Sequence, residues 1–276
     1  MAHATLSHSS DHLHDHYTDN GEHIVSKDAQ LSDIGRWLSR GWQDLLQAPG
    51  ASAFYGLIMA AAVMLVYAAY QAQPVMIFKT ATFFVMLSPF LATGLYALSQ
   101  QIQNGQSPKL LESMMAWRHN TTNFALFALS LGVIIAIWGR IVPMIAAIAQ
   151  SDQLLIVNPE AGVLGFLGSQ AGIDFVSYFM VLGALAAAFV FTISVVTIPL
   201  MLKDPKVGVI SAMVLSYQVT MENKTVMTAW ALTVGALVTL GLLTVGILMV
   251  VIMPLLGYAS WHAFNDLIEV KNTHHN

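Results

Sequence analysis

The run from Thr225 to Gly257 constrains this chain most, because it contains no charged residue. A bilayer core about 30 Å thick is crossed by about 20 helical residues, and lipid offers no water to exposed backbone groups. The run is therefore predicted to cross a membrane as a helix. It exceeds the length of one untilted span, which leaves a sixth crossing open beside the five predicted below.

The composition extends this prediction to the whole chain, which is 56% hydrophobic and only 9% charged. In soluble proteins about a quarter of all residues are charged, so these values are typical of a polytopic membrane protein. The chain has no Cys, which excludes disulfides, thiolate metal sites and iron–sulfur clusters. Its few Lys and Arg form no basic stripe, so no nucleic acid is expected as a partner.

Apolar runs predict an all-α bundle with five spans and amphipathic helices at the membrane surface. A tail of residues 1–31, rich in His and Asp, is predicted to be disordered, 32–270 to form one transmembrane domain, and 271–276 a short tail. Surface helices are expected after Ser32 or Asp33, from Leu110 to His119, before Asn223 and after Gly257. The predicted spans are about 52–70, 75–98, 123–149, 174–202 and 225–257.

Basic residues outside the spans set the predicted orientation. Eight Lys and Arg lie on the side of the amino terminus, and three, Lys79, Arg140 and Lys271, lie on the other side. The positive-inside rule therefore places the amino terminus in the cytoplasm, and five spans place the carboxyl terminus outside.

Prolines indicate an internal repeat. Pro199 follows Pro89 by 110 residues, and Pro254 follows Pro143 by 111. Both halves share the order of kinked span, basic turn, surface helix, Asn and span, which predicts two parallel repeats related by an axis along the membrane normal. Chance spacing of prolines is the alternative.

Few residues are candidates for a functional site. In the tail, His8, His12, His14 and His16 alternate with Asp residues, a composition that binds divalent metal or simply forms a solvated polar segment. Arg140 and Asp174 are predicted to pair near the outer surface, because an unpaired charge at membrane depth is costly. The alternative is an Arg140 side chain held by outer headgroups or by carbonyls freed at Pro143.

No cofactor is expected, and the chain is not predicted to be an enzyme. The predicted spans contain no His, and a catalytic oxidase subunit needs several to hold its haems and copper. With five spans, His119 and His262 lie on opposite faces of the membrane, so they could not share one haem iron.

Three segments resemble an uncharacterised bacterial inner-membrane family, the domain of unknown function 2189. They are Gly41-Trp42 with Asp44, the segment Ser211 to Asn223 with Trp230 beyond it, and the stretch Pro254 to Leu267. The likeness covers about Leu31 to Glu269, and its signature residues at the membrane interface are Trp42, Asp44, Asn223, Trp261, His262 and Asp266. Because some members are labelled cytochrome c oxidase subunits, the resemblance implies a respiratory-chain protein.

The sequence therefore predicts a non-catalytic accessory or scaffold protein of a bacterial inner-membrane, and by resemblance respiratory, complex. Its expected partners are the lipid bilayer and either other membrane subunits or a second copy of the chain. Small residues from Gly183 to Ala188 suit close packing against a partner helix. The alternative is a small-solute permease or channel built on the two repeats, although the predicted spans offer no buried acid to couple protons.

Overall fold

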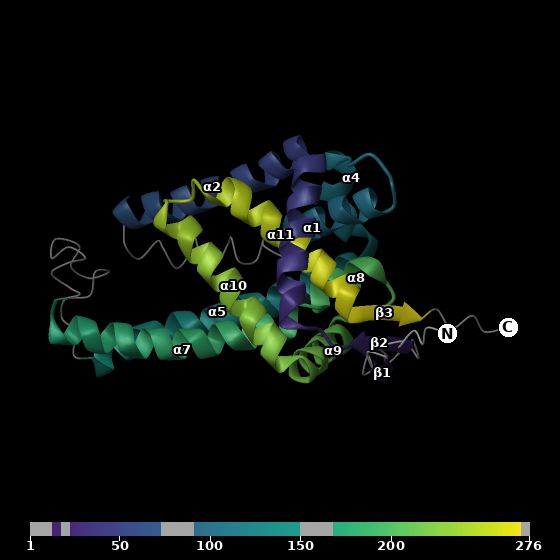
Figure 1. The fold of residues 1–276 in the computed structure, drawn as a ribbon. Coiled ribbons are helices and arrows are strands. Elements are labelled where there is room, and N and C mark those ends of the chain that lie inside the picture. Colours follow the sequence, from purple (N-terminus) through teal and green to yellow (C-terminus); the bar gives the residue numbers. More distant parts are fainter. Residues whose placement is uncertain (1–12, 18–22, 73–90, 150–167, 272–276) are drawn as a thin grey trace, which may run out of the picture.

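The computed structural model describes residues 13–17, 23–72, 91–149 and 168–271, and helices dominate it (Figure 1). Residues 91–103 are also helical, and they form the described end of the second predicted span. The elements are β1 (Leu13–Tyr17), β2 (His23–Lys27), α1 (Leu31–Gln47), α2 (Pro49–Ala72), α4 (Leu110–Met114), the 3₁₀ helix η1 (Ala116–Asn120), α5 (Thr121–Ile148), α7 (Gln170–Ser194), α8 (Thr197–Lys203), α9 (Val209–Glu222), α10 (Lys224–Leu243), α11 (Met249–Leu267) and β3 (Ile268–Lys271).

Four helical segments in the described part of the chain are long and apolar enough to cross a membrane. They are Pro49–Ala68, Leu110–Ile145, Gln170–Lys203 and Lys224–Leu243. These segments agree with four of the predicted spans, and the all-α membrane bundle is confirmed at this level. Most of the second predicted span, residues 75–90, lies outside the described residues.

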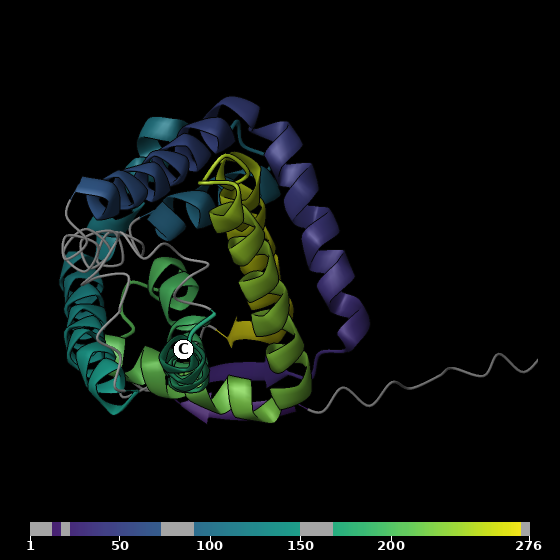
Figure 2. The ribbon, with the colours of Figure 1, turned by 90° about the vertical axis from the view of Figure 1, so that its left-hand side faces the viewer.

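Helix α1 lies across the ends of the other helices rather than along them (Figures 1 and 2). It begins where the Gln30 backbone N–H donates to Asp33 Oδ2 over 3.0 Å. At its other end, Pro49 opens α2, and a proline in the first turn of a helix removes an N–H that has no intrahelical partner there. The predicted surface helix before the first span is therefore present.

The long apolar run from Thr225 to Gly257 is not one helix, and that prediction is wrong. Helix α10 ends at Leu243 and α11 begins at Met249, with Val245 at φ 53° and Gly246 at φ 89° in the turn between them. Backbone bonds within the turn satisfy its polar groups, for example from the Gly246 N–H to the Gly241 carbonyl over 3.0 Å. Hydropathy misses such a turn because apolar residues form it.

Helix α11 then continues without a break to Leu267, so the separate surface helix predicted after Gly257 is also wrong. The residues Trp261, His262, Phe264 and Leu267 of this last part are buried inside the protein. The apolar and polar alternation expected of a surface helix arises here because the polar side chains bind partners on neighbouring helices.

The two ends of the chain meet in a small antiparallel sheet of order β1-β2-β3. Within it, Ile24 pairs with Val270 and Ser26 with Ile268. This pairing brings Ile268–Lys271 beside His23–Lys27, whereas five spans predict the two ends of the chain on opposite sides of a membrane. The prediction of disorder is wrong for 13–17 and 23–27, where the buried β-branched residues Ile24 and Val25 favour a strand.

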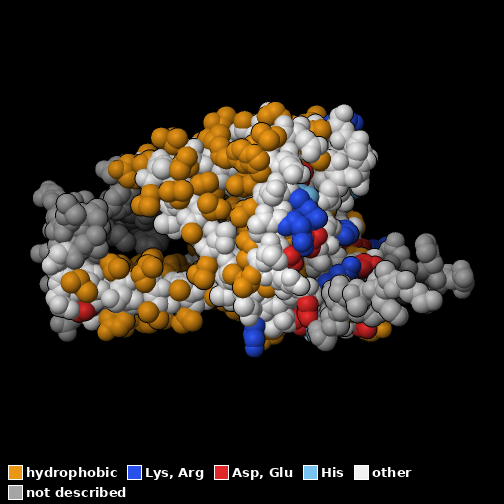
Figure 3. Space-filling view, viewed as in Figure 1, with side chains coloured by type: hydrophobic (Ala, Val, Ile, Leu, Met, Phe, Trp, Pro, Cys, Tyr) orange, Lys and Arg blue, Asp and Glu red, His pale blue; other side chains and the backbone are white. Residues whose placement is uncertain are grey.

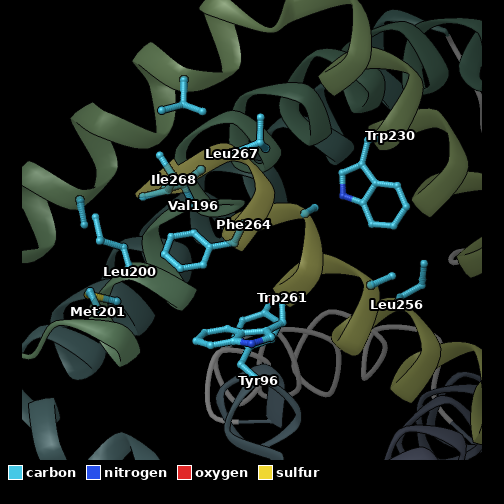
Figure 4. Packing of buried hydrophobic residues seen from close by; sticks show 14 of the residues in the cluster. Tyr96, Val196, Leu200, Met201, Trp230, Leu256, Trp261, Phe264, Leu267 and Ile268 are labelled. Atoms are coloured by element: carbon cyan, nitrogen blue, oxygen red, sulfur yellow. The ribbon is translucent and has the colours of Figure 1, made fainter. Parts of the chain in front are cut away.

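The hydrophobic core lies next to the sheet, where helices from both halves of the chain converge. Trp37 is among its largest buried side chains, and so are Trp230, Trp261 and Phe264, which Figure 4 shows. The rings of Trp261 and Tyr96 stack at 6.0 Å between centroids. Away from this core, apolar side chains cover the surface, whereas most charged side chains on the face shown gather near the sheet (Figure 3).

Candidate functional site

The residues with the densest polar contacts form a cluster, here called the polar end, between α1, residues 91–103 and α11. At its centre, the His262 Nε2–H donates to Asp44 Oδ2 over 2.9 Å. The Ser99 hydroxyl donates to the same carboxylate oxygen. All three side chains are buried, and Asp44 and Ser99 are 4% and 0% exposed. A buried carboxylate needs such donors because burial removes its water.

A second set of bonds fixes the other nitrogen of the His262 ring. The Gln103 amide donates to His262 Nδ1 over 3.1 Å, and the Trp261 indole N–H donates to Gln103 Oε1 over 3.1 Å. The direction of these bonds is consistent with an imidazole that carries its proton on Nε2. Each polar group of the cluster therefore has a partner, and the cluster joins three helices.

The cluster does not have the geometry of a hydrolytic triad. In a triad the histidine accepts the proton of a serine hydroxyl and the acid orients that histidine. Here the Ser99 hydroxyl donates to Asp44 instead of His262. The buried arrangement supports a positioning role for these residues, with Asp44 holding the ring of His262 and the helix end around Ser99.

Asp266 forms a second group of contacts at the polar end. Its carboxylate accepts from the Trp37 indole N–H over 3.0 Å and pairs with Arg40 at 3.0 Å. Arg36 lies between two acids, at 2.8 Å from Asp33 and 3.6 Å from Asp266. One acid on α11 thus binds three side chains of α1, which fixes the surface helix against the end of the bundle.

The signature residues predicted from the resemblance come together only in part. Asp44 and His262 bind one another, and Trp261 joins them through Gln103, a residue that sequence reasoning missed, as it missed Ser99. The remaining three lie elsewhere around this end: Asp266 binds α1, Asn223 binds the segment before α1, and Trp42 is 46% exposed. Ser99 and Gln103 follow an apolar run, and in the sequence they indicate only that a span has ended.

The histidines of the tail face carboxylates where they are described. His14 lies 3.5 Å from Asp28, and His16 lies 3.2 Å from Glu222 of α9. Within the described residues no group of three or more His, Cys, Asp or Glu is placed to hold a metal ion. His8 and His12 lie outside the described residues.

The predicted pair of Arg140 and Asp174 does not appear as an ion pair among the described residues. Arg140 is exposed on α5, and Asp174 accepts from the Gln170 amide over 2.9 Å within α7. Their pairing stays a prediction.

His119 and His262 lie on the same side of the bundle, because α11 returns to the end that carries η1. This overturns their predicted separation, which followed from five spans. Their partners nevertheless differ, since the His119 Nδ1 atom contacts the Ala116 carbonyl at 3.1 Å.

The comparisons with known proteins support the membrane assignment. No curated protein matches the chain, and no solved structure matches it. One family model matches residues 75–203, from the second predicted span through α4, α5 and α7 to α8. The stretch from Pro254 to Leu267, which carried much of the resemblance, lies outside that match. Over residues 75–203 this chain matches the family described as "Predicted integral membrane protein (DUF2189)", a family of unknown function.

Proposed function

We propose that this integral membrane protein is a non-catalytic accessory or scaffold component of a complex in the bacterial cytoplasmic membrane. Its partners would be the bilayer and either other membrane subunits or a second copy. The observation that carries the proposal is the separation of two kinds of surface: a polar end whose buried groups are satisfied within the chain, and spans that leave most of their apolar surface uncovered.

The proposed topology has six crossings with both ends of the chain in the cytoplasm. The turn between α10 and α11 supplies the additional crossing, and the pairing of β2 with β3 supports an even number. Lys271 of β3 then joins the cytoplasmic side, so the basic residues divide nine to two instead of eight to three. The positive-inside rule favours this division more strongly than the earlier one.

The uncovered surface of α7 supports a role in helix packing. Only 11% of the most apolar window in Gln170–Lys203 is buried inside the protein, the lowest share among the four candidate spans. A Cβ atom added at Gly183 would meet the Trp138 ring of α5 at 3.7 Å, so this edge already has a neighbour. Ala184, Ala187 and Ala188 are exposed, and small residues allow another helix to approach closely.

The described residues offer little for a transport cycle. Proton or ion coupling needs ionisable groups inside the spans, facing a cavity or one another. The described charges of β2, α1, α11 and β3 pair with one another instead, while Arg140 is exposed on α5 and Asp174 binds Gln170 within α7. An accessory role requires none of these groups inside the bundle.

The test is isolation of the native protein in mild detergent, followed by mass spectrometry of the proteins that remain bound. Other membrane subunits in stoichiometric amounts, or a defined homo-oligomer, would support the proposal, and oxidase subunits would support its respiratory form. A lone chain that moves a solute across liposomes would defeat it and favour the permease.

A paired variant connects that test to α7. Ala187→Leu places a larger side chain on the exposed small-residue face, and we expect it to reduce partner recovery several-fold. Val181→Leu changes a large residue that is already exposed on the same helix, and it serves as the matched control. Equal recovery from both variants would contradict a partner on this face.

A further inference from the structure

Two asparagines make the same pair of hydrogen bonds at corresponding places in the fold. Asn223 Oδ1 accepts from the Ala29 N–H over 2.7 Å, and its amide donates to the Lys27 carbonyl over 3.3 Å. Asn123 Oδ1 accepts from the Val209 N–H over 3.1 Å, and its amide contacts the Val207 carbonyl at 3.5 Å. In both cases the bonded backbone groups are two residues apart.

The places of these asparagines in the chain also correspond. Asn123 lies in the first turn of α5, after η1, and it holds the segment that leads into α9. Asn223 caps the start of α10, after α9, and it holds the segment that leads into α1. Each asparagine therefore follows one surface helix and fixes the start of another.

The start of α4 is held by a third side-chain amide. The Lys109 N–H donates to Gln101 Oε1 over 2.7 Å, just before α4 begins at Leu110. N–H groups at the start of a helix lack intrahelical partners, and a neutral amide oxygen can accept from them. All three surface segments, α1, α4 with η1, and α9, thus begin at a backbone N–H bound by an amide from another part of the chain.

We infer that the fold is a closed ring of three related units, in which Asn123, Asn223 and Gln101 are the residues that position successive surface helices. The units are 23–103, 104–203 and 204–271. Each consists of a surface helix, an outward helix and a returning helix. The inference replaces two parallel repeats by three, and it goes beyond the proposed function because it concerns how the chain closes on itself.

The units pack against one another in the same way at each joint, by which we mean the contact between two successive units. The surface helix α9 packs on α7 and α8, where Ser216 accepts from the Val196 N–H over 3.2 Å. Leu110 of α4 packs against the cluster that contains Leu91 and Leu95. Each of these surface helices therefore rests on the returning helix of the preceding unit.

The third joint closes the ring between the last unit and the first. Helix α1 of the first unit packs closely on α11, the returning helix of the third unit, through Gly41. The pairing of β2 with β3 then joins the chain ends at this joint.

The joint between the first two units has its own chemistry. Helix α2 begins with Pro49, whereas α5 and α10 have Asn123 and Asn223 near their starts. The start of α2 therefore offers no asparagine amide. Gln101, on the returning helix of the first unit, provides the acceptor oxygen instead. The hydroxyl groups of Tyr55 and Ser113 also bind one another, over 2.9 Å. The bound N–H belongs to the first residue of α9, to the residue before α4 and to the second residue before α1.

Matched substitutions test the equivalence of the two asparagines. Asn123→Leu and Asn223→Leu each keep a similar side-chain volume and remove both hydrogen bonds. We expect melting temperatures of the purified protein to fall by several degrees, and by the same amount in the two variants. Asn104→Leu, in the exposed turn before α4, is the control and should change nothing. A fall in one variant alone would overturn the equivalence.

Circular permutation tests the ring itself. With Asn276 joined to Met1, the full chain would be opened either at Gly105 or between Pro205 and Lys206, both at boundaries between units. Opening between Val245 and Gly246 divides the third unit and provides the comparison. We expect the boundary permutants to insert in membranes and to melt close to the natural chain, and the third to melt well below them. The inference is overturned if the divided unit is as stable as the boundary permutants, or if neither boundary permutant folds.

Discussion

The helices packed along α11 and the outer parts of α5 and α7 are held in different ways. Along α11, the helices α1 and α2 approach so closely that glycines are required at their contacts, and at the polar end buried polar groups bind specific partners. Along α5 and α7, many apolar side chains are exposed, and Gly139 has open space around it. The first region is specified residue by residue, whereas the second needs only to be apolar.

The largest expected difference is between the sides of the membrane on which the segments lie, and reporter fusions measure it. Reporter fusions after residues 104, 206 and 276 should all read cytoplasmic, and fusions after 155 and 246 should read external. The reason is that the polar end gathers the sheet and the surface helices on one side. An external reading at 276 with a cytoplasmic reading at 104 would separate the two ends of the chain and break the comparison.

Adding one methyl group at a glycine is expected to lower the stability in the closely packed region and not in the other. A Cβ atom added at Gly56 of α2 would lie 2.1 Å from the Val250 carbonyl oxygen of α11, a backbone atom that cannot move aside alone. Gly56→Ala is therefore expected to cost about 3 kcal/mol or more of stability. Gly139→Ala has nothing within 4 Å, and replacing a helical glycine should leave stability unchanged or raise it by about 0.5–1 kcal/mol. Thermal unfolding in one detergent compares the two, and equal losses would contradict the close contact between α2 and α11.

These two regions also show what the sequence could and could not predict. Hydropathy located four helices that are long and apolar enough to cross a membrane, although the last of them ends at Leu243 instead of Gly257. It failed at Gly246, where a positive φ reverses the chain inside an apolar run, and at β2, where the short apolar pair Ile24-Val25 lies in a polar tail. The turn at Gly246 is local and is formed by apolar residues, whereas the pairing of β2 with β3 joins distant segments, and residue composition encodes neither.

The candidate site was predictable to a similar extent. Asp44, His262 and Asp266 stand out as polar residues within apolar helical patterns, so the sequence could single them out. Their partners could not be assigned, because Asp44 and His262 are brought together only when α11 returns along α1. Ser99 and Gln103 carried no signal beyond being polar residues at the end of a span.

Removing the buried acid tests whether the polar cluster supports the fold. Asp44→Ala leaves the His262 N–H and the Ser99 hydroxyl without their acceptor, and each buried unsatisfied group costs about 1–3 kcal/mol. We expect a loss of about 2–4 kcal/mol for Asp44→Ala. Asp174→Ala, at the exposed start of α7, should stay within about 0.5 kcal/mol of the natural protein. Chemical unfolding followed by Trp fluorescence provides the measurement, and a neutral Asp44→Ala would show that the cluster contributes little.

The smallest expected effect compares two pairs of oppositely charged residues, of which only one forms an ion pair in the described structure. Arg40 and Asp266 lie 3.0 Å apart and are partly exposed, so a double-mutant cycle with Arg40→Leu and Asp266→Asn should give a coupling of about 0.5–1 kcal/mol. For Arg140→Leu and Asp174→Asn we expect a coupling near zero, because the described structure places no ion pair between them. A coupling at Arg140 and Asp174 as large as at Arg40 and Asp266 would restore the pairing predicted from the sequence. It would also mean that charges fix the outer part of α5 and α7 as specifically as they fix α1 on α11.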